Sequence, residues 1–497
     1  MTRTSPQKQR PTDHTRAIQA PRRPEDQLAE IRAFMEAHRM KEKFTPGSFG
    51  EFETELHQRL LELERDLIAE VMRSADVDAE AIEIEGKVHR RVLRSAQTYM
   101  TSAGPVTVER WLYKDRTDDD ARTVSPMDQR LGIVDGFWTE KAAKSALWVV
   151  TQMTPGKAEE LFARVGNMSP SKSSLDRLPK ALSERWEAGR DEHEAALRDA
   201  LVIPDGAVSV AVSLDGVLAP MEGTRPVEKR NLAAAEGRVI KGPVGYREVG
   251  CATLAFCDDK GDLLGAVRMA RAPEQNKRTL KASLAAELVA ALAKQPQLRI
   301  VKLADGVDDN WTFLSDELPE GIEVLDFFHA TEHLHAAVAV AYGDGTRETQ
   351  YRYDNLRETL RDDADGVAKV IRALDHLRKK CPRSTVIERT TAYFRKHRRR
   401  MNYAAVKAQG LMIGSGVVEA ACKTLVAQRL KLSGMRWGRA GAQAILTPRG
   451  WDQSDRFDEA WARVAATYQV EVYVLANIIA LKPPREPRGP RRQAASR

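Results

Sequence analysis

The sequence is poor in cysteine and contains no long hydrophobic run. Its four cysteines, Cys251, Cys257, Cys381 and Cys422, form no C-x-x-C pair, which argues against a zinc ribbon or a disulfide framework. No stretch approaches the roughly 18 apolar residues of a membrane-spanning helix, and the Arg-, Pro- and Gln-rich start is no secretory signal. No internal repeat is present. We therefore expect a cytoplasmic protein with no membrane contact.

The net charge of +7 is concentrated at the two ends of the chain. Residues 1–25 carry six Lys or Arg against two acids, and residues 482–497 carry six against one. The rest of the chain has a slight acidic excess, so a polyanion-binding surface there requires local segregation of charge. We predict that both tails are disordered and basic, a composition that often adds non-specific phosphate contacts.

The first 200 residues favour helices interrupted by one β-hairpin. Apolar residues recur at helical spacing between Phe52 and Val71, and two strand-like runs around Gly104-Pro105 predict the hairpin. Thr154-Pro155 and Ser169-Pro170 each place a capping residue before a helix start. The resulting spacing resembles a helix–turn–helix, whose second helix at 170–178 would present Lys172, Ser174 and Arg177 on one exposed face for DNA.

From about residue 205 the pattern alternates between strand and helix. Strands are predicted at 207–214, 248–257, 263–270, 298–304 and 323–328, with helices at 278–294 and 309–317. The order βββαβαβ is typical of RNase H-like nucleases. The fold class is therefore α/β, with a mixed five-stranded sheet as the catalytic core.

Residues 335–410 predict a basic helical insertion in this core. The cations include Arg398, Arg399 and Arg400, and Tyr393, Phe394 and Tyr403 lie among them. A basic surface with aromatic residues suits backbone contact and base stacking on DNA. The complete predicted organisation is a tail at 1–25, a helical segment at 26–85, a hairpin region at 86–135, a helix–turn–helix-like region at 136–200, the first part of the core at 201–334, the insertion at 335–410, the final core helices at 411–482 and a tail at 483–497.

Three carboxylates stand at the ends of separate predicted elements. Asp215 and Asp305 each follow an apolar strand and precede a glycine, and Glu419 follows Gly414-Ser415-Gly416 at the start of a helix. Strand ends hold carboxylates rigidly, and the adjacent glycines leave room for a metal and a phosphate. Hard cations such as Mg²⁺, with Mn²⁺ as a substitute, prefer such oxygen ligands. The pattern predicts a phosphoryl-transfer site.

Two ambiguities remain at this stage. Asp308, Asp309 and Asp326 all compete with Asp305 for the role of second acid, and Asp326 also stands at a predicted strand end. The strand end and the following glycine favour Asp305. The run from His329 to His333 matches H-x-x-E-H, a zinc-peptidase pattern in which both histidines share one helix face. A zinc metallopeptidase is therefore an alternative.

At these residues the chain resembles DDE transposases of bacterial insertion sequences. The nearest likeness is to the ISKra group, with Mutator-like transposases more distant. The resemblance runs from about 85 to 465, and its most specific pieces are the runs 213–217, 304–306, 324–334, 414–419 and 429–437.

The resemblance implies a catalytic and metal-binding triad of Asp215, Asp305 and Glu419. It also implies supporting roles for Asp326 and His329, DNA contacts at Lys431 and Arg436 in the last run, and terminal inverted-repeat DNA as substrate. Two DNA ends must meet, so a homodimer or a larger assembly on DNA is expected, at the bacterial nucleoid. We expect strand cleavage and strand transfer, and a non-catalytic DNA-binding protein on the same scaffold is the alternative.

Overall fold

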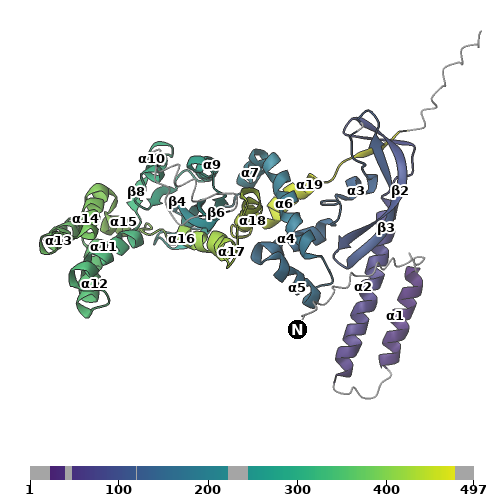
Figure 1. The fold of residues 1–497 in the computed structure, drawn as a ribbon, viewed down its shortest axis with the longest axis horizontal. Coiled ribbons are helices and arrows are strands. Elements are labelled where there is room, and N and C mark those ends of the chain that lie inside the picture. Colours follow the sequence, from purple (N-terminus) through teal and green to yellow (C-terminus); the bar gives the residue numbers. More distant parts are fainter. Residues whose placement is uncertain (1–22, 40–46, 119, 222–234, 236–244, 476–497) are drawn as a thin grey trace, which may run out of the picture. The chain divides into compact units, whose positions relative to one another are not determined.

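The computed structural model describes residues 23–39, 47–118, 120–221, 235 and 245–475 (Figure 1). Most of both predicted tails lies outside these residues, although α1 already begins at Pro24, inside the predicted first tail. The fold is mixed α/β, and the chain divides into two compact units. One comprises Met1–Ala142, Val165–Ser169 and Gln469–Arg497, and the other comprises Ala143–Arg164 and Pro170–Tyr468.

The first unit combines two helices with an antiparallel sheet. Helix α1 (Pro24–Arg39) packs on α2 (Ser48–Ser74), and the strand order is β3-β2-β1-β9. The element bounds are Ala81–Ile84 for β1, Lys87–Thr101 for β2, Gly104–Asp115 for β3, Pro126–Leu131 for α3 and Val472–Val474 for β9. The predicted hairpin is therefore confirmed, as β2 and β3. Gly104 closes its turn at a φ of +109°, a conformation that favours glycine.

Strand β9 corrects the prediction for the end of the chain. We predicted that the final core helices extend to residue 482, but the last helix, α19 (Phe457–Ala466), ends well before it, and Val472–Val474 pairs with β1. The run Val-Tyr-Val is rich in residues that favour strands, and an edge of the first sheet was open to receive it. The segment from 476 onward lies outside the described residues.

The second unit is built around a mixed five-stranded sheet of order β6-β5-β4-β7-β8. Strands β4, β5 and β6 form an antiparallel meander, while β7 and β8 run parallel to β4. The bounds are Ser209–Pro220 for β4, Tyr246–Cys257 for β5, Leu263–Arg271 for β6, Arg299–Ala304 for β7 and Ile322–Leu325 for β8. The predicted strand and helix order is thus present, with α9 (Arg278–Lys294) and α10 (Asp308–Asp316) between the last three strands.

Two strand ends differ from the prediction. Strand β4 does not stop before Asp215: its pairing with β7 ends at Ser213, but its pairing with β5 continues to Pro220. The fifth strand ends at Leu325 rather than 328, because Asp326 caps the following helix α11 (Phe327–Tyr342). Asp215 therefore lies within strand β4, just past the point where the pairing with β7 ends and only the pairing with β5 continues.

Helices cover both faces of this sheet. On one face Leu280 of α9 lies against Gly250 of β5. On the other, Cys251 and its neighbour Val249 belong to the same apolar cluster as Val418 and Leu425. The elements on this second face are α16 (Gly416–Ala421), a π-helical turn (Cys422–Ala427), α17 (Gln428–Leu430) and α18 (Arg439–Asp452). Side chains of β5 thus alternate between the two faces, as strand geometry requires.

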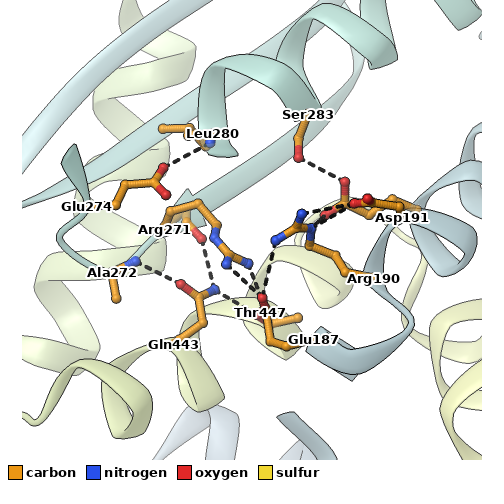
Figure 2. A network of polar contacts seen from close by, with 12 residues as sticks. Glu187, Arg190, Asp191, Arg271, Ala272, Glu274, Leu280, Ser283, Gln443 and Thr447 are labelled. Carbon is orange, nitrogen blue, oxygen red and sulfur yellow. Dashed lines mark hydrogen bonds and ion pairs between the residues drawn. The ribbon is translucent and has the colours of Figure 1, made fainter. Parts of the chain in front are cut away.

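A polar network ties the helices before the sheet to its outer strand (Figure 2). Arg271 of β6 makes a two-pronged ion pair with Glu187, at 2.6 and 2.7 Å, and Gln443 of α18 accepts a hydrogen bond from the backbone of Ala272. Glu187 belongs to α6 (Lys172–Ala188), which precedes α7 (Arg190–Asp199). The predicted boundary at residues 200 and 201 therefore does not coincide with a boundary between compact units.

The predicted insertion is helical throughout its ordered elements (Figure 1). After α11 come α12 (Arg347–Asp362), α13 (Gly366–Lys380), α14 (Thr385–His397), a 3₁₀ turn (Arg398–Arg400) and α15 (Tyr403–Ala408). Phe394 and Tyr403 are fully buried in the core of this unit, so the prediction that they stack on bases is wrong. Burying these large apolar rings in the core stabilises the fold, and it leaves no ring surface for a base to stack on.

Two further helices precede α6, namely α4 (Glu140–Gln152) and α5 (Pro155–Val165). Within the described residues, every helix is too short or too polar to cross a membrane.

Candidate functional site

The sheet places three of the predicted acids at one level of its edge. The last β4–β7 pair is Ser213 with Leu303, so the same register, continued by two residues, sets Asp215 beside Asp305. The last β7–β8 pair is Ala304 with Leu325, which sets Asp305 beside Asp326. Neighbouring strands lie about 4.8 Å apart, so the three carboxylates come from adjacent positions although long stretches of chain separate them.

Asp215 is half-buried, and both of its oxygens have partners. The Gly216 backbone N–H donates to Oδ1 at 2.6 Å, and the Cys422 thiol donates to Oδ2 at 3.5 Å. Burial raises the pKa of the Asp215 carboxyl, and the charge on Asp305 raises it further. The charge of Asp305 therefore reaches Asp215, as expected where two carboxylates lie close enough to share a cation.

Asp305 follows β7 and is held by the start of α10. Its Oδ1 accepts from the Val307 backbone N–H and from the Asn310 side-chain amide, both at 3.2 Å. Trp311 donates to its backbone carbonyl at 2.5 Å. Among the described residues no hydrogen bond reaches Oδ2, so one oxygen of this carboxylate is available to a ligand.

Glu419 is exposed on α16, the short helix that faces the acidic edge. Partial desolvation is the largest cause that raises the pKa of its carboxyl. The charges of Asp326, Glu332 and Asp215 raise this pKa further. The chain approaches this helix closely: a Cβ on Gly414 would stand 2.5 Å from the ring of Phe328. Gly414 therefore allows the start of α16 to pack against α11.

Asp326, the competing second acid, has a structural role. Only 2% of its surface is exposed. Its carboxylate accepts from the backbone N–H groups of Phe328 and His329 at the start of α11, and from that of Ser415 at 2.9 Å. It thereby caps one helix and anchors the chain that leads to Glu419. Asp305, with its free oxygen, is the better candidate ligand.

The H-x-x-E-H segment lies on α11. His329 and His333 share one face, with ring centroids 5.0 Å apart, and the side chain of Glu332 lies 3.8 Å from His329. Burial lowers the pKa of His333, with the neighbouring His329 adding to the effect. His333 packs against the Tyr393 ring at 4.4 Å, which gives it a packing partner besides any ligand.

A divalent metal would need several of these side chains to converge on one point. Throughout the described ranges, no three His, Cys, Asp or Glu side chains are gathered closely enough to hold one ion. The donors at the acidic edge are carboxylate oxygens, which match Mg²⁺ or Mn²⁺ better than Zn²⁺. The residues therefore fit Mg²⁺ in the kind of donor, while their side chains do not converge on one point.

The residues predicted to contact DNA fall into two groups. Lys172, Arg177, Arg398, Arg399, Lys431 and Arg436 are exposed, as a phosphate contact requires. Ser174 is buried: its hydroxyl lies 3.0 Å from that of Ser171, which caps α6, so the exposed-face prediction is wrong for Ser174. Ser171 and not Ser169 begins the helix.

Arg400 also departs from the prediction. It pairs with Glu323 at 2.7 Å, and its guanidinium lies 4.0 Å from the centre of the Trp311 ring. Both contacts hold the 3₁₀ turn against the edge of the sheet, so Arg400 is already engaged inside the protein. Arg398 and Arg399 have no ion pair within the described part of the chain.

The sequence did not indicate that three further residues lie at this edge. Asn310 orients Asp305, Cys422 contacts Asp215, and Tyr393 lies so close to Gly306 that a Cβ there would be 2.2 Å from its ring. Contacts with Cys251, burial and the charge of Asp215 hold the pKa of the Cys422 thiol well above its usual range. The available signal was spacing: Cys422 is three residues after Glu419, on the same helix side.

Comparison with known proteins adds no identification. No protein-family model matches the chain, and no curated protein matches it.

Proposed function

We propose that this protein is a DNA transposase that cuts and joins strands at Asp215, Asp305 and Glu419. The observation that carries the proposal is the register of β4 with β7, which sets Asp215 level with Asp305, together with the charge of Asp305 that raises the pKa of Asp215. On the facing helix, partial burial and then the charges of Asp326, Glu332 and Asp215 raise the pKa of Glu419. The strand order β6-β5-β4-β7-β8 and the helical insertion support an RNase H-like core, and the resemblance to insertion-sequence transposases points the same way.

The carboxylates have distinct means of support. Asp215 is fixed by its neighbour's N–H and by a thiol, and Asp305 is oriented by Asn310. Asp215, Asp305 and Glu419 would hold Mg²⁺, which when bound supplies the positive charge that stabilises the attacking and leaving oxygens of a phosphodiester. Asp326 would keep Glu419 near the sheet through its bond to the Ser415 backbone.

The reaction itself is an in-line displacement at phosphorus. In cleavage, a water oxygen bonds to phosphorus while the bond to the 3′-oxygen breaks, and that oxygen takes up a proton. In strand transfer, the oxygen of the freed 3′-hydroxyl bonds to the phosphorus of a target phosphodiester and gives up its proton. At the same time the bond from that phosphorus to the target's own 3′-oxygen breaks, and this oxygen takes up a proton. Neither step requires a covalent protein intermediate. The protein's part is to hold three carboxylates around the reacting phosphate and to exclude other geometries.

Exposed cations provide a means of holding the DNA. Arg398 and Arg399 follow α14, and Lys431 and Arg436 follow α17. Phosphate contacts by such residues would position a duplex without reading its sequence. We infer terminal inverted repeats and target duplex as the DNA partners, with two copies of the chain bridging two ends.

The test is cleavage of a plasmid that carries the DNA flanking the gene, in Mg²⁺, by single variants. Asp215→Asn, Asp305→Asn and Glu419→Gln should each abolish cleavage, while mobility-shift assays at one salt concentration show retained DNA binding. Asp309→Asn is the matched control, because Asp309 stands close to Asp305 in sequence but pairs with Lys281. Near wild-type cleavage by any of the three would remove that residue from the site.

Asp326→Asn separates the two candidates for the second acid. Asn keeps one acceptor oxygen but loses the charge-assisted caps, so this variant should unfold more easily, by about 1 kcal/mol. Asp305→Asn should instead be stable and inactive. Full activity of Asp305→Asn together with a stable, inactive Asp326→Asn would reverse the assignment.

A further inference from the structure

The Asp215 carboxylate is held from two sides by groups of different character. Its Oδ1 accepts from the N–H of the next residue in the same strand, at 2.6 Å. Its Oδ2 accepts from the thiol of Cys422, at 3.5 Å between sulfur and oxygen. The first contact is local, but the second joins positions 207 residues apart. Of these two contacts, the thiol is the one that links the carboxylate to the turn directly after the helix that carries Glu419.

The position of this thiol depends on an irregular turn. Cys422 is the first residue of the π-helical turn Cys422–Ala427, directly after α16. The carbonyls of Thr424 and Leu425 in this turn accept hydrogen bonds from the guanidinium of Arg449, of which only 4% is exposed. π-Helical turns are rare and frequently occur at functional sites. Arg449 of α18 thus holds the irregular turn through two of its carbonyls.

The strand opposite places a second thiol on the same side of the sheet. Cys251 of β5 is the cross-strand partner of Asp215, so their side chains point to the same face. Both Cys251 and Cys422 lie in an apolar cluster with Val249 and Leu425. In apolar surroundings a hydrogen bond to a charged oxygen is stronger than in water, even from a weak donor such as a thiol.

We propose that Cys422 is a positioning residue for Asp215: its thiol donates to Oδ2 and fixes the direction in which this carboxylate presents its remaining lone pairs to Mg²⁺. The inference rests on the proposed function, since it takes Asp215 as a metal ligand. Groups that hydrogen-bond a ligating carboxylate orient it, and their loss typically weakens metal binding by about 10–100-fold. Because a thiol is a weak donor, we expect the lower end of this range.

The first test detects the hydrogen bond itself in the full-length, metal-free protein. The infrared S–H stretch of Cys422 is isolated as the difference between wild type and Cys422→Ala. The same difference is then recorded in an Asp215→Asn background. Because a neutral amide oxygen is a weaker acceptor than a carboxylate, the band should move to higher frequency in that background. An identical band in both backgrounds would overturn the proposal.

The second test measures Mn²⁺ binding by the paramagnetic resonance of the free ion, which requires no catalysis. Cys422→Ala should weaken Mn²⁺ binding about tenfold, and Cys422→Ser, which restores a donor, should recover most of the loss. Cys257→Ala is the matched control: it removes another buried thiol of β5, whose sulfur lies 3.9 Å from the Ala255 carbonyl and makes no contact with an acid of the site. It should bind Mn²⁺ like wild type.

The outcomes separate this inference from the proposed function. If Asp215→Asn loses Mn²⁺ binding but Cys422→Ala does not, the positioning role is wrong and the metal site stands. If Asp215→Asn binds Mn²⁺ as wild type does, Asp215 is no ligand, and both proposals fail. Equal weakening by Cys422→Ala and Cys257→Ala, without recovery by Cys422→Ser, would reduce Cys422 to a packing role.

Discussion

The two glycines that follow the candidate aspartates should respond differently to alanine. A Cβ at Gly306 would lie 2.2 Å from Cε2 of Tyr393, whereas a Cβ at Gly216 would lie 1.9 Å from the terminal oxygen of Glu248. Neither glycine has a positive φ, so backbone strain plays no part. The difference lies in what can move. The Glu248 side chain is flexible and half-exposed, so it can turn away. The Tyr393 ring is packed between the rings of His333 and His397 and cannot turn away freely.

The magnitudes follow from these neighbours. Tyr393 packs against His333 at 4.4 Å and His397 at 5.0 Å, and it must shift by more than about 1 Å to reach ordinary contact distance from a Cβ at Gly306. Such overpacking costs about 1–3 kcal/mol. At Gly216 the shift breaks only the ion pair of Glu248 with Lys277, which costs at most about 1 kcal/mol. The lower chain entropy of alanine offsets part of that loss.

Native-state hydrogen exchange of residues 299–316 provides the assay, because it reports local opening without a two-state assumption for the whole chain. Gly306→Ala should lower the opening free energy of this segment by about 1–3 kcal/mol, and Gly216→Ala by less than about 1 kcal/mol. Tyr393→Leu removes the ring atoms that a Cβ at Gly306 would meet. In that background, Gly306→Ala should therefore leave the opening free energy almost unchanged. Equal effects of the two glycine variants, or a Gly306→Ala cost that persists in the Tyr393→Leu background, would refute the reasoning.

Three further predictions concern charge. Burial, with the cations around it, holds the pKa of His397 at about 4, so the folded protein stays neutral there while the unfolded chain takes up a proton below about pH 6.5. Stability should fall by up to about 3 kcal/mol as the pH drops from 6.5 toward 4, and denaturant titrations should show a smaller fall in His397→Gln. Replacing Arg398 and Arg399 with Ala should weaken DNA binding equally across sequences and lower the salt slope by about 1 per residue, whereas Arg400→Ala should mainly reduce stability. Arg177→Ala should relax discrimination between the element's ends and random duplex by about 1–3 kcal/mol in competition binding, and an equal loss on both would make it a phosphate contact.

Local signals were sufficient for the order of elements in the second unit. Turn residues such as Asp258 and Gly261 separate apolar runs of strand length, and α9 spans the same 278–294 segment that its pattern predicted. The hairpin β2–β3 was predictable for the same reason. Strand and helix periods depend on residues close in sequence, so these elements follow from the sequence without knowledge of their partners.

Features that depend on distant partners were missed or misplaced. Ser174, Phe394 and Tyr403 have polar or aromatic side chains suited to DNA, but caps and core packing already use them. Arg400 is engaged because Glu323 and Trp311 lie beside it, which no local pattern reveals. All of these errors have the same cause. The chemistry of a side chain shows what it can bind, but only the fold decides whether it already makes that contact inside the protein.

The sequence by itself determined which acids could form a site, because Asp215, Asp305 and Glu419 stand out by their position next to glycines and strands. The tertiary structure alone decided how each is held. The register of β4 with β7 sets the two aspartates level, and the π-helical turn brings Cys422 to Asp215. Register and helix docking arise from packing between segments far apart in the chain, and a linear pattern carries no record of those distances.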